Sequence, residues 1–215
     1  RTRVLANVVD PDKSITPGRG NLSFTSINLP RLGIKYGIVN GREEADFDGF
    51  YNELGELLEL VKDQLLDRFE IQCSKHIYNF PFLLGQGVWL DSEKLKPNDR
   101  IRRVLKHGTL SIGFIGLAEC LKALIGQHHG ESDEAQELGL KIIGFIREKC
   151  DEYSEKYNLN VSCLATPAEG LSGRFVGIDR SIYGKIKGVT DREYYTNSFH
   201  VPVYYKTTIQ HKLEV

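Results

Sequence analysis

The sequence predicts an α/β fold, because short strand-like segments alternate with long amphipathic helices along the chain. Apolar residues make up 40% of the 215 residues and aromatic residues 10%, which is enough for a packed core. The 28 Lys and Arg residues balance 29 Asp and Glu residues, whereas a dedicated nucleic-acid binder usually carries a clearly basic face. No apolar run approaches the roughly 20 residues that span a bilayer. We therefore expect a globular domain with neither nucleic acid nor a membrane as its partner.

The first half of the chain is predicted to contain two strands and one long helix. Residues 3–9 (RVLANVV) are strand-like, and a turn-rich segment with Pro and Gly follows them. Residues 21–30 alternate apolar and polar side chains, which predicts a strand that Pro30 ends. Residues 46–70 carry one apolar stripe at helical spacing, which predicts an amphipathic helix. A loop with Pro and Gly follows at 76–100.

The second half of the chain begins with a segment that is predicted to change from a strand to a helix. Residues 107–126 start extended and become helical, and Gly113 and Gly116 mark the change. Glycines at this spacing allow a close backbone approach, either to another element of the fold or to a ligand. Residues 131–158 predict a second long amphipathic helix, with Ser132 as its N-cap and acidic residues in its first turn.

A strand predicted at 159–165 meets a helix start in the sequence TPAEG, residues 166–170. Thr166 is a candidate N-cap, Pro167 suits the first helical position, and Glu169 falls at the third, which predicts a capping box. The remaining free N–H groups of such a helix start suit a phosphate group. Taken alone, the motif fits either a capped helix with nothing bound or a phosphate site.

Two further clusters carry polar side chains suited to a hydroxyl-bearing ligand. Asn21 begins a strand after a glycine-rich turn, and its amide can both donate and accept; Asn28 lies further along and could serve equally. In the segment 195–202 (YTNSFHVP), Asn197 and His200 could line a polar pocket before a final strand. Purely structural roles, such as capping a turn, remain the alternative for each of these residues.

The cysteines and the paired histidines predict no metal site. Four cysteines are widely spaced without a CxxC pair, so neither a zinc site nor a disulfide framework is expected. We expect them to be reduced, mostly buried residues of a cytoplasmic protein. His128 and His129 adjoin in a loop without metal-ligand spacing, and we expect them to be solvated.

Four motifs, taken together, resemble the anaerobic (class III) ribonucleoside-triphosphate reductases. They are GRGNLSFTSINLPRLGI, HGTLSIGFIGLAE, TPAEGLSGRF and YTNSFHVPV, and they occur in the family's order from near the start of the chain almost to its end. Their joint occurrence makes the resemblance specific. It implies half of a ten-stranded α/β barrel of the glycyl-radical and ribonucleotide reductase type, with residues 1–215 as a single partial catalytic-barrel domain.

The resemblance implies an oxidoreductase that makes deoxyribonucleoside triphosphates, the precursors of DNA, from ribonucleoside triphosphates. The chemistry would use glycyl and thiyl radicals, with formate, or a thiol system in some members, as the reductant. Asn21 would be the catalytic residue that orients the ribose and helps proton movement. The implied substrate-binding residues are Asn28, Thr166, Pro167, Ala168, Glu169, Gly170, Asn197 and His200.

The resemblance also implies cofactors and partners that these residues do not carry. A glycyl radical, generated by a radical-SAM activating enzyme, and a zinc site are expected in a C-terminal segment, and the family forms homodimers. The chain contains no Met and opens on RTRVLANVV, which resembles the sequence just after the family's radical-bearing Cys. We therefore expect a piece of the barrel that lacks both radical-bearing residues and is inactive by itself.

Two alternatives stay open at this point. One is a non-catalytic nucleotide-binding module that kept the cleft without the radical apparatus. The other is a different glycyl-radical enzyme with an organic-acid substrate, which should lack TPAEG because it has no triphosphate to hold.

Overall fold

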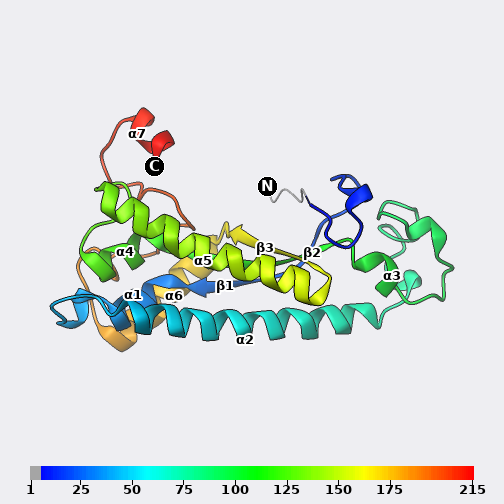
Figure 1. Ribbon diagram of the computed structural model, residues 1–215, viewed down its shortest axis with the longest axis horizontal. Coiled ribbons are helices and arrows are strands. Elements are labelled where there is room, and N and C mark those ends of the chain that lie inside the picture. Colours follow the sequence, from blue (N-terminus) through cyan, green and yellow to red (C-terminus); the bar gives the residue numbers. More distant parts are fainter. Residues whose placement is uncertain (1–5) are drawn as a thin grey trace. The chain divides into compact units, whose positions relative to one another are not determined.

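The computed structural model describes residues 6–215, and they form two compact units. Unit 1 contains residues 6–25, 59–112 and 147–164, and unit 2 contains residues 26–58, 113–146 and 165–215. The helices and strands, shown in Figure 1, are β1 (Asn21–Asn28), α1 (Leu29–Tyr36), α2 (Phe47–Cys73), α3 (Arg102–Leu105), β2 (Thr109–Ile115), α4 (Leu117–Ile125), α5 (Asp133–Tyr157), β3 (Asn160–Ala165), α6 (Glu169–Tyr183) and α7 (Ile209–Glu214). The predicted α/β class is confirmed, and the single partial domain stays a prediction.

Within residues 6–215 one sheet has three strands in the order β1-β2-β3. The strands run parallel: a side chain on Gly108 would meet Leu22, one on Gly113 would meet Ser26, and Ser111 lies 3.1 Å from Ser162 between hydroxyl oxygens. The central strand β2 is buried at every position, as expected for a parallel strand covered on both faces. A parallel sheet whose strands are joined through helices is compatible with part of an α/β barrel.

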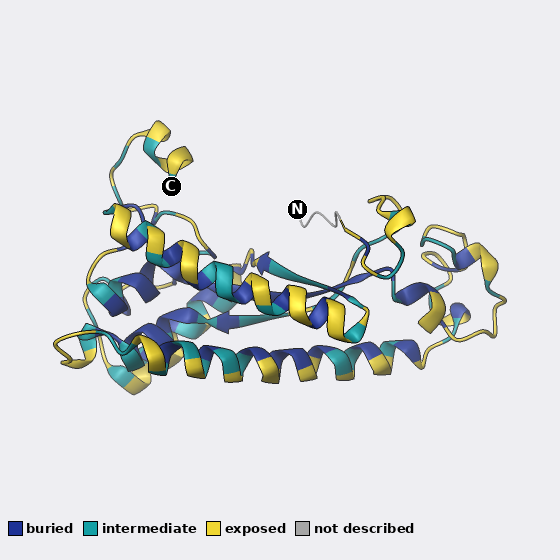
Figure 2. Ribbon diagram, in the orientation of Figure 1, coloured by how far each residue is buried: buried dark blue, intermediate teal, exposed yellow. Residues whose placement is uncertain are grey.

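The two long helices follow the predicted pattern. Figure 2 shows buried and exposed residues alternating along α2 and α5, because each presents one apolar stripe to its surroundings. Both end within three residues of the predicted bounds. The hydroxyl of Ser132 accepts a hydrogen bond from the backbone N–H of Ala135 at 3.2 Å, which confirms Ser132 as the N-cap of α5.

The helix α1 was not predicted. The strand ends at Asn28, and Pro30 lies in the first turn of α1, where its missing N–H costs no hydrogen bond. Two glycines then let α1 lie against α4 in unit 2. A Cβ atom on Gly33 would lie 2.6 Å from the carbonyl oxygen of Cys120, and one on Gly37 would lie 2.0 Å from that of Ala123.

The strands predicted at the two chain ends are not found among the described residues. Residues 3–5 lie outside the described part, and residues 6–9 form no strand. Residues 195–205 are also irregular, because their first backbone groups bond to the start of α4: the N–H groups of Gly116 and Leu117 donate to the carbonyls of Thr196 and Ser198.

Three of the cysteines, Cys73, Cys120 and Cys150, are buried and free, and Cys163 is half-buried and free. The expectation that His128 and His129 are solvated is wrong, since they are 1% and 5% exposed, and burial lowers the pKa of both. Among residues 6–215, no helix is both long enough and apolar enough to cross a bilayer.

Candidate functional site

The start of α6 differs from the predicted capping box. The helix begins at Glu169 with Ala168 as its N-cap, and no side chain makes a capping hydrogen bond. Thr166 is not the cap because its buried hydroxyl lies 2.8 Å from the hydroxyl of Ser26, beside Gly113 of the central strand β2. Glu169 is therefore the first helical residue rather than the third, and its carboxylate does not fold back. The first N–H groups of α6 lack partners within the helix.

The missing side chain of Gly113 leaves the space that the Thr166 side chain occupies. A Cβ atom at Gly113 would come within 1.9 Å of the Thr166 hydroxyl oxygen and 2.8 Å of that of Ser26, so only glycine leaves room for this pair. Of the two alternatives left open for Gly113, close packing is the one the structure supports. Gly170, in contrast, has open space beside it, since a Cβ there would meet nothing within 4 Å. The helix start is thus fixed at Thr166 and accessible at Gly170.

A cavity of about 560 Å³ lies beside this helix start in unit 2. We call it the α6 pocket. It collects three of the predicted site residues and three that the sequence did not single out: Glu169, Asn197 and His200, together with Ser172, Arg192 and Lys212. Residues from the first turn of α6, from the irregular segment after it and from α7 thus meet in one pocket.

The charges of the α6 pocket favour an anionic ligand. Arg192 and Lys212 supply two positive charges against the single carboxylate of Glu169. The Arg192 guanidinium carbon lies 3.4 Å from the ring centroid of Tyr204, which restricts where the planar donor group can point. Burial raises the pKa of Tyr204, so this ring stays neutral at physiological pH. The dipole of α6 adds to the attraction for negative charge at its start.

The pocket wall at residues 196–198 is anchored by Glu119, a buried carboxylate in the first turn of α4. Its Oε1 accepts hydrogen bonds from the Thr196 backbone N–H at 2.9 Å and from the Thr196 hydroxyl at 2.6 Å. Next to it, the buried Oδ1 of Asn197 has no hydrogen-bond partner among the described residues. Ser198 adopts a left-handed backbone conformation with φ of 44°, which is unusual for a residue other than glycine.

We predict that Glu119 makes stability depend on pH. Burial raises its pKa, so the folded state holds the proton more tightly than the unfolded state. The contribution of Glu119 to stability is therefore largest below its unfolded-state pKa and is lost as pH rises through its folded-state pKa. Glu119→Gln should remove this fall, so that wild type loses thermal stability relative to the variant as pH rises above the ordinary carboxyl range of about 4. The exposed Glu137→Gln is the control, and parallel curves for wild type and Glu119→Gln would contradict the prediction.

Asn28 lies in a buried polar network of unit 2 rather than in the α6 pocket. Its Nδ2 donates to Oδ2 of Asp179 at 2.7 Å, and the Tyr195 hydroxyl donates to the same oxygen at 2.9 Å. Arg31 donates to Oδ1 of Asp179 through Nε at 2.7 Å and Nη2 at 2.6 Å. Asn28 thus has a structural partner, while its buried Oδ1 has none among the described residues.

Asn21 lies in unit 1 at the start of β1, where it is exposed. It lines a cavity of about 210 Å³ whose other walls are mostly apolar, including the chain's one Trp residue, Trp89. Its amide shares this mostly apolar cavity with one other polar side chain, that of Gln72. The role of Asn21 as the catalytic residue stays a prediction.

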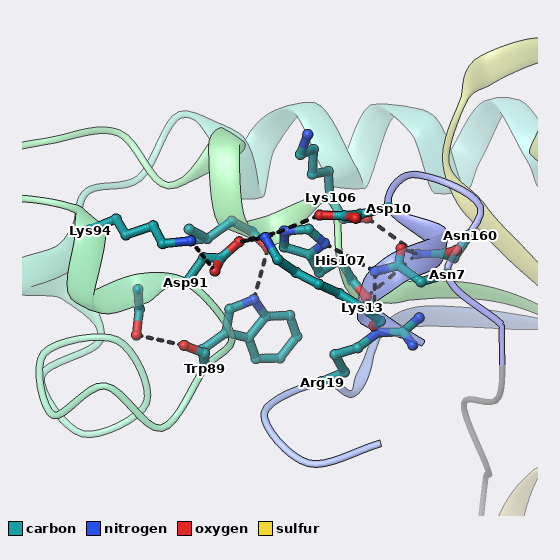
Figure 3. Close-up of polar contacts among 12 residues, drawn as sticks. Asn7, Asp10, Lys13, Arg19, Trp89, Asp91, Lys94, Lys106, His107 and Asn160 are labelled. Carbon is teal, nitrogen blue, oxygen red and sulfur yellow. Dashed lines mark hydrogen bonds and ion pairs between the residues drawn. The ribbon is translucent and has the colours of Figure 1, made fainter. Parts of the chain in front are cut away.

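Unit 1 contains a polar cluster of its own around His107, which is 2% exposed (Figure 3). Its Nε2 lies 3.3 Å from Oδ2 of Asp91, and its Nδ1 lies 3.2 Å from Nδ2 of Asn7. These contacts assign the proton to Nε2, because the Asn7 amide donates to Nδ1. Burial lowers the pKa of His107 and outweighs the attraction of Asp91. Both nitrogens of this neutral ring are occupied, so the cluster tethers residues 7–13 to the sheet region.

Comparison with known proteins identifies the family. The family model described as anaerobic ribonucleoside-triphosphate reductase matches residues 1–215, which is the whole chain. The chain belongs to this family. The anaerobic ribonucleoside-triphosphate reductase of Salmonella typhimurium is 32% identical over 205 residues, which cover 94% of this chain and 28% of that relative. The reductase of Enterobacteria phage T4 is 32% identical over 191 residues, which cover 88% of this chain and 29% of the relative.

Solved reductase structures share the fold. The anaerobic ribonucleotide reductase from Thermotoga maritima in complex with dATP and CTP matches with a TM-score of 0.65 and 19% identity, over 91% of this chain and 29% of that one. The same reductase with citrate in its active site gives a TM-score of 0.64. The present chain thus spans less than a third of the length of the reductases it matches. The family and the α/β fold expected from the four motifs are confirmed.

The sequence did not point to Arg192 or Lys212. Neither belongs to a recognisable motif, and they come from two segments that only the folded chain brings to one pocket. Across the described residues, no group of three or more His, Cys, Asp and Glu side chains is placed to hold a metal ion.

Proposed function

We propose that this chain supplies the phosphate-binding pocket of an anaerobic ribonucleoside-triphosphate reductase, which converts ribonucleoside triphosphates to deoxyribonucleoside triphosphates. The α6 pocket carries this proposal, because it combines an uncapped helix start with Arg192 and Lys212. Helix starts of this kind bind phosphate through backbone N–H groups. The Thermotoga maritima reductase has been solved in complex with dATP and CTP, which both carry a triphosphate, and CTP is a ribonucleoside triphosphate.

The pocket offers a distinct role to each of its polar groups. The N–H groups around Glu169 and Gly170 donate to phosphate oxygens, and the planar guanidinium of Arg192 can bind two of them at once. Lys212 adds a flexible positive charge at the rim. Asn197 supplies Oδ1 as an acceptor for a ligand hydroxyl or amino group, since that buried oxygen has no partner among the described residues.

We also propose that Asn21 orients the substrate ribose, as the resemblance implies. In this proposal the glycyl radical and the zinc site lie outside these 215 residues. The proposed partners are a radical-SAM activating enzyme, formate as the reductant and the second subunit of a homodimer. The described residues of this chain contain no group of three or more His, Cys, Asp and Glu side chains that could hold the zinc ion. We also propose that the protein that carries this chain is located in the cytoplasm.

Lys212→Gln should weaken binding of a ribonucleoside triphosphate to the protein that carries this chain. We expect Kd to rise roughly tenfold, because a charged contact to phosphate contributes on the order of 1.5 kcal/mol or more. Glu169→Gln should have the opposite effect and tighten binding by a few fold, since it removes a like charge from the pocket. Calorimetric titration with ATP and CTP measures both.

Lys187→Gln is the matched control, because Lys187 is exposed in the same unit and does not line the pocket. Hydrogen exchange should show ligand protection at residues 166–170 in wild type. Unchanged affinity in Lys212→Gln together with unprotected 166–170 amides would refute the phosphate assignment. In a turnover assay of the protein that carries this chain, Lys212→Gln should raise KM more than it lowers kcat.

A further inference from the structure

A second pocket, in unit 1, has the properties of an anion site. It has a volume of about 530 Å³, and four of its lining side chains are cationic: Arg100, Arg102, Arg103 and Lys106. We propose that this basic pocket binds a polyphosphate, such as the phosphate chain of a nucleotide. The site shares no residue with the α6 pocket and is independent of the function proposed above.

The positive charge of the basic pocket is concentrated and mostly uncompensated. Residues 96–106 (KPNDRIRRVLK) contain five Lys or Arg residues and one Asp, in a chain whose net charge is −1. Among the described residues, Arg102 forms an ion pair with Glu70, while Arg100, Arg103 and Lys106 form none. No acidic side chain lines the pocket. Three cationic groups therefore keep their full attraction for a ligand.

The backbone around the pocket holds these groups at one place. Arg102 and Arg103 lie on the short helix α3, and Tyr157, the last residue of α5, also lines the pocket. Below Arg102 lies the buried ring of Phe69, 5.8 Å from the guanidinium carbon to the ring centroid. Figure 3 shows the Lys106 ammonium pointing away from the His107 cluster, so it is not used there.

More positive charge lies close to Tyr157, one of the residues that line the pocket. The ammonium groups of Lys62 and Lys156 lie 5.6 Å and 5.3 Å from the ring centroid of Tyr157. Lys62 is neutralised by Glu59 and Asp63, whereas Lys156 has no ion pair within residues 6–215. The Tyr157 ring that lines the pocket thus lies close to a further cation, Lys156, which adds to the local positive potential.

The arrangement fits a polyphosphate better than a single phosphate. Like charges held together repel one another, and a ligand with several negative charges removes this repulsion at all of them. Arginine side chains match phosphate oxygens in a two-point geometry, and three of the four cations are arginines. The pocket also falls within the volume range of about 300–1,000 Å³ that small-molecule sites occupy.

The test compares two double variants of the protein that carries this chain, at about 0.15 M ionic strength. Arg103→Gln with Lys106→Gln removes two pocket charges that make no described ion pair. Lys185→Gln with Lys187→Gln is the matched control, because both residues are exposed, lie in unit 2 and line neither pocket. Sodium triphosphate and ATP are the probes, and hydrogen exchange of residues 100–106 and 157–159 reports this pocket separately from residues 166–170.

We expect both probes to protect residues 100–106 and 157–159 in wild type. The pocket variant should need at least roughly tenfold more probe for half-protection, while the control stays within about twofold. Equal affinity for the two probes would show that the phosphate chain alone is recognised, and tighter ATP binding would add a contact to the base; both support the proposal. If neither probe protects these residues, or if probe binding weakens equally in the pocket variant and the control, the proposal is overturned. The four cations would then contact an acidic protein surface or solvent.

Discussion

Replacing Asp179 with alanine is expected to lower the free energy of unfolding by about 3 kcal/mol, since two buried donors lose their acceptor and the partly exposed Arg31 loses its counter-ion. The Asp179 side chain is fully buried and accepts hydrogen bonds from Asn28, Arg31 and Tyr195. Removing it leaves the Tyr195 hydroxyl and the Asn28 amide without this partner, and the Arg31 guanidinium without its counter-ion. Asp179→Asn keeps the shape and should cost less.

Asp151→Ala is the control for loss of an aspartate. Asp151 pairs with Arg147 at 3.7 Å, but both side chains are exposed, so the change should stay within about 0.5 kcal/mol. Urea denaturation followed by circular dichroism measures both variants. If Asp179→Ala unfolds at the same urea concentration as Asp151→Ala, the buried network does not stabilise unit 2 in the way its contacts indicate.

Replacing Gly37 with alanine is expected to lower the free energy of unfolding by about 1–3 kcal/mol, the usual effect of overpacking. The added Cβ would lie 2.0 Å from the carbonyl oxygen of Ala123 and 2.5 Å from its carbonyl carbon. Both atoms belong to the backbone of α4, so no side-chain rotation relieves the clash. The helices α1 and α4 would have to separate.

The same substitution at Gly144 should have the opposite sign. Gly144 lies inside α5, and a Cβ there would meet nothing within 4 Å. Gly144→Ala should therefore raise the free energy of unfolding by about 0.5–1 kcal/mol, since alanine loses less conformational entropy in a helix. Thermal and urea unfolding of the two variants give the comparison. Destabilisation by both, to the same extent, would mean that helix contact is not what requires glycine at position 37.

The parts of the fold that were predictable from sequence are those whose signal is local. The apolar stripes of α2 and α5 are periodic within each segment, so their type and approximate bounds followed directly. The hydroxyl of Ser132 capped its helix as expected, because no other described residue forms a hydrogen bond with it. At Thr166 the same local rule failed, since Ser26, 140 positions earlier in the chain, accepts or donates the hydrogen bond that a cap would have used.

The candidate site was predictable only in part for the same reason. Glu169, Asn197 and His200 stood out through motifs, and the fold places them in one pocket. The bond between Glu119 and Thr196 joins residues 77 positions apart, so no periodicity could reveal it. The cations Arg192 and Lys212 carry no local signal and become recognisable only from the pocket they share.

The Asp179 network has a consequence for how the α6 pocket meets its ligand. Tyr195, which adjoins Thr196 and Asn197 in the pocket wall, is bonded to a carboxylate that α6 itself carries. The wall cannot loosen without leaving a buried charge partly unpaired, so its disorder is suppressed before any ligand arrives. Association then requires little ordering of the protein, and its entropic cost comes mainly from the ligand's own lost freedom.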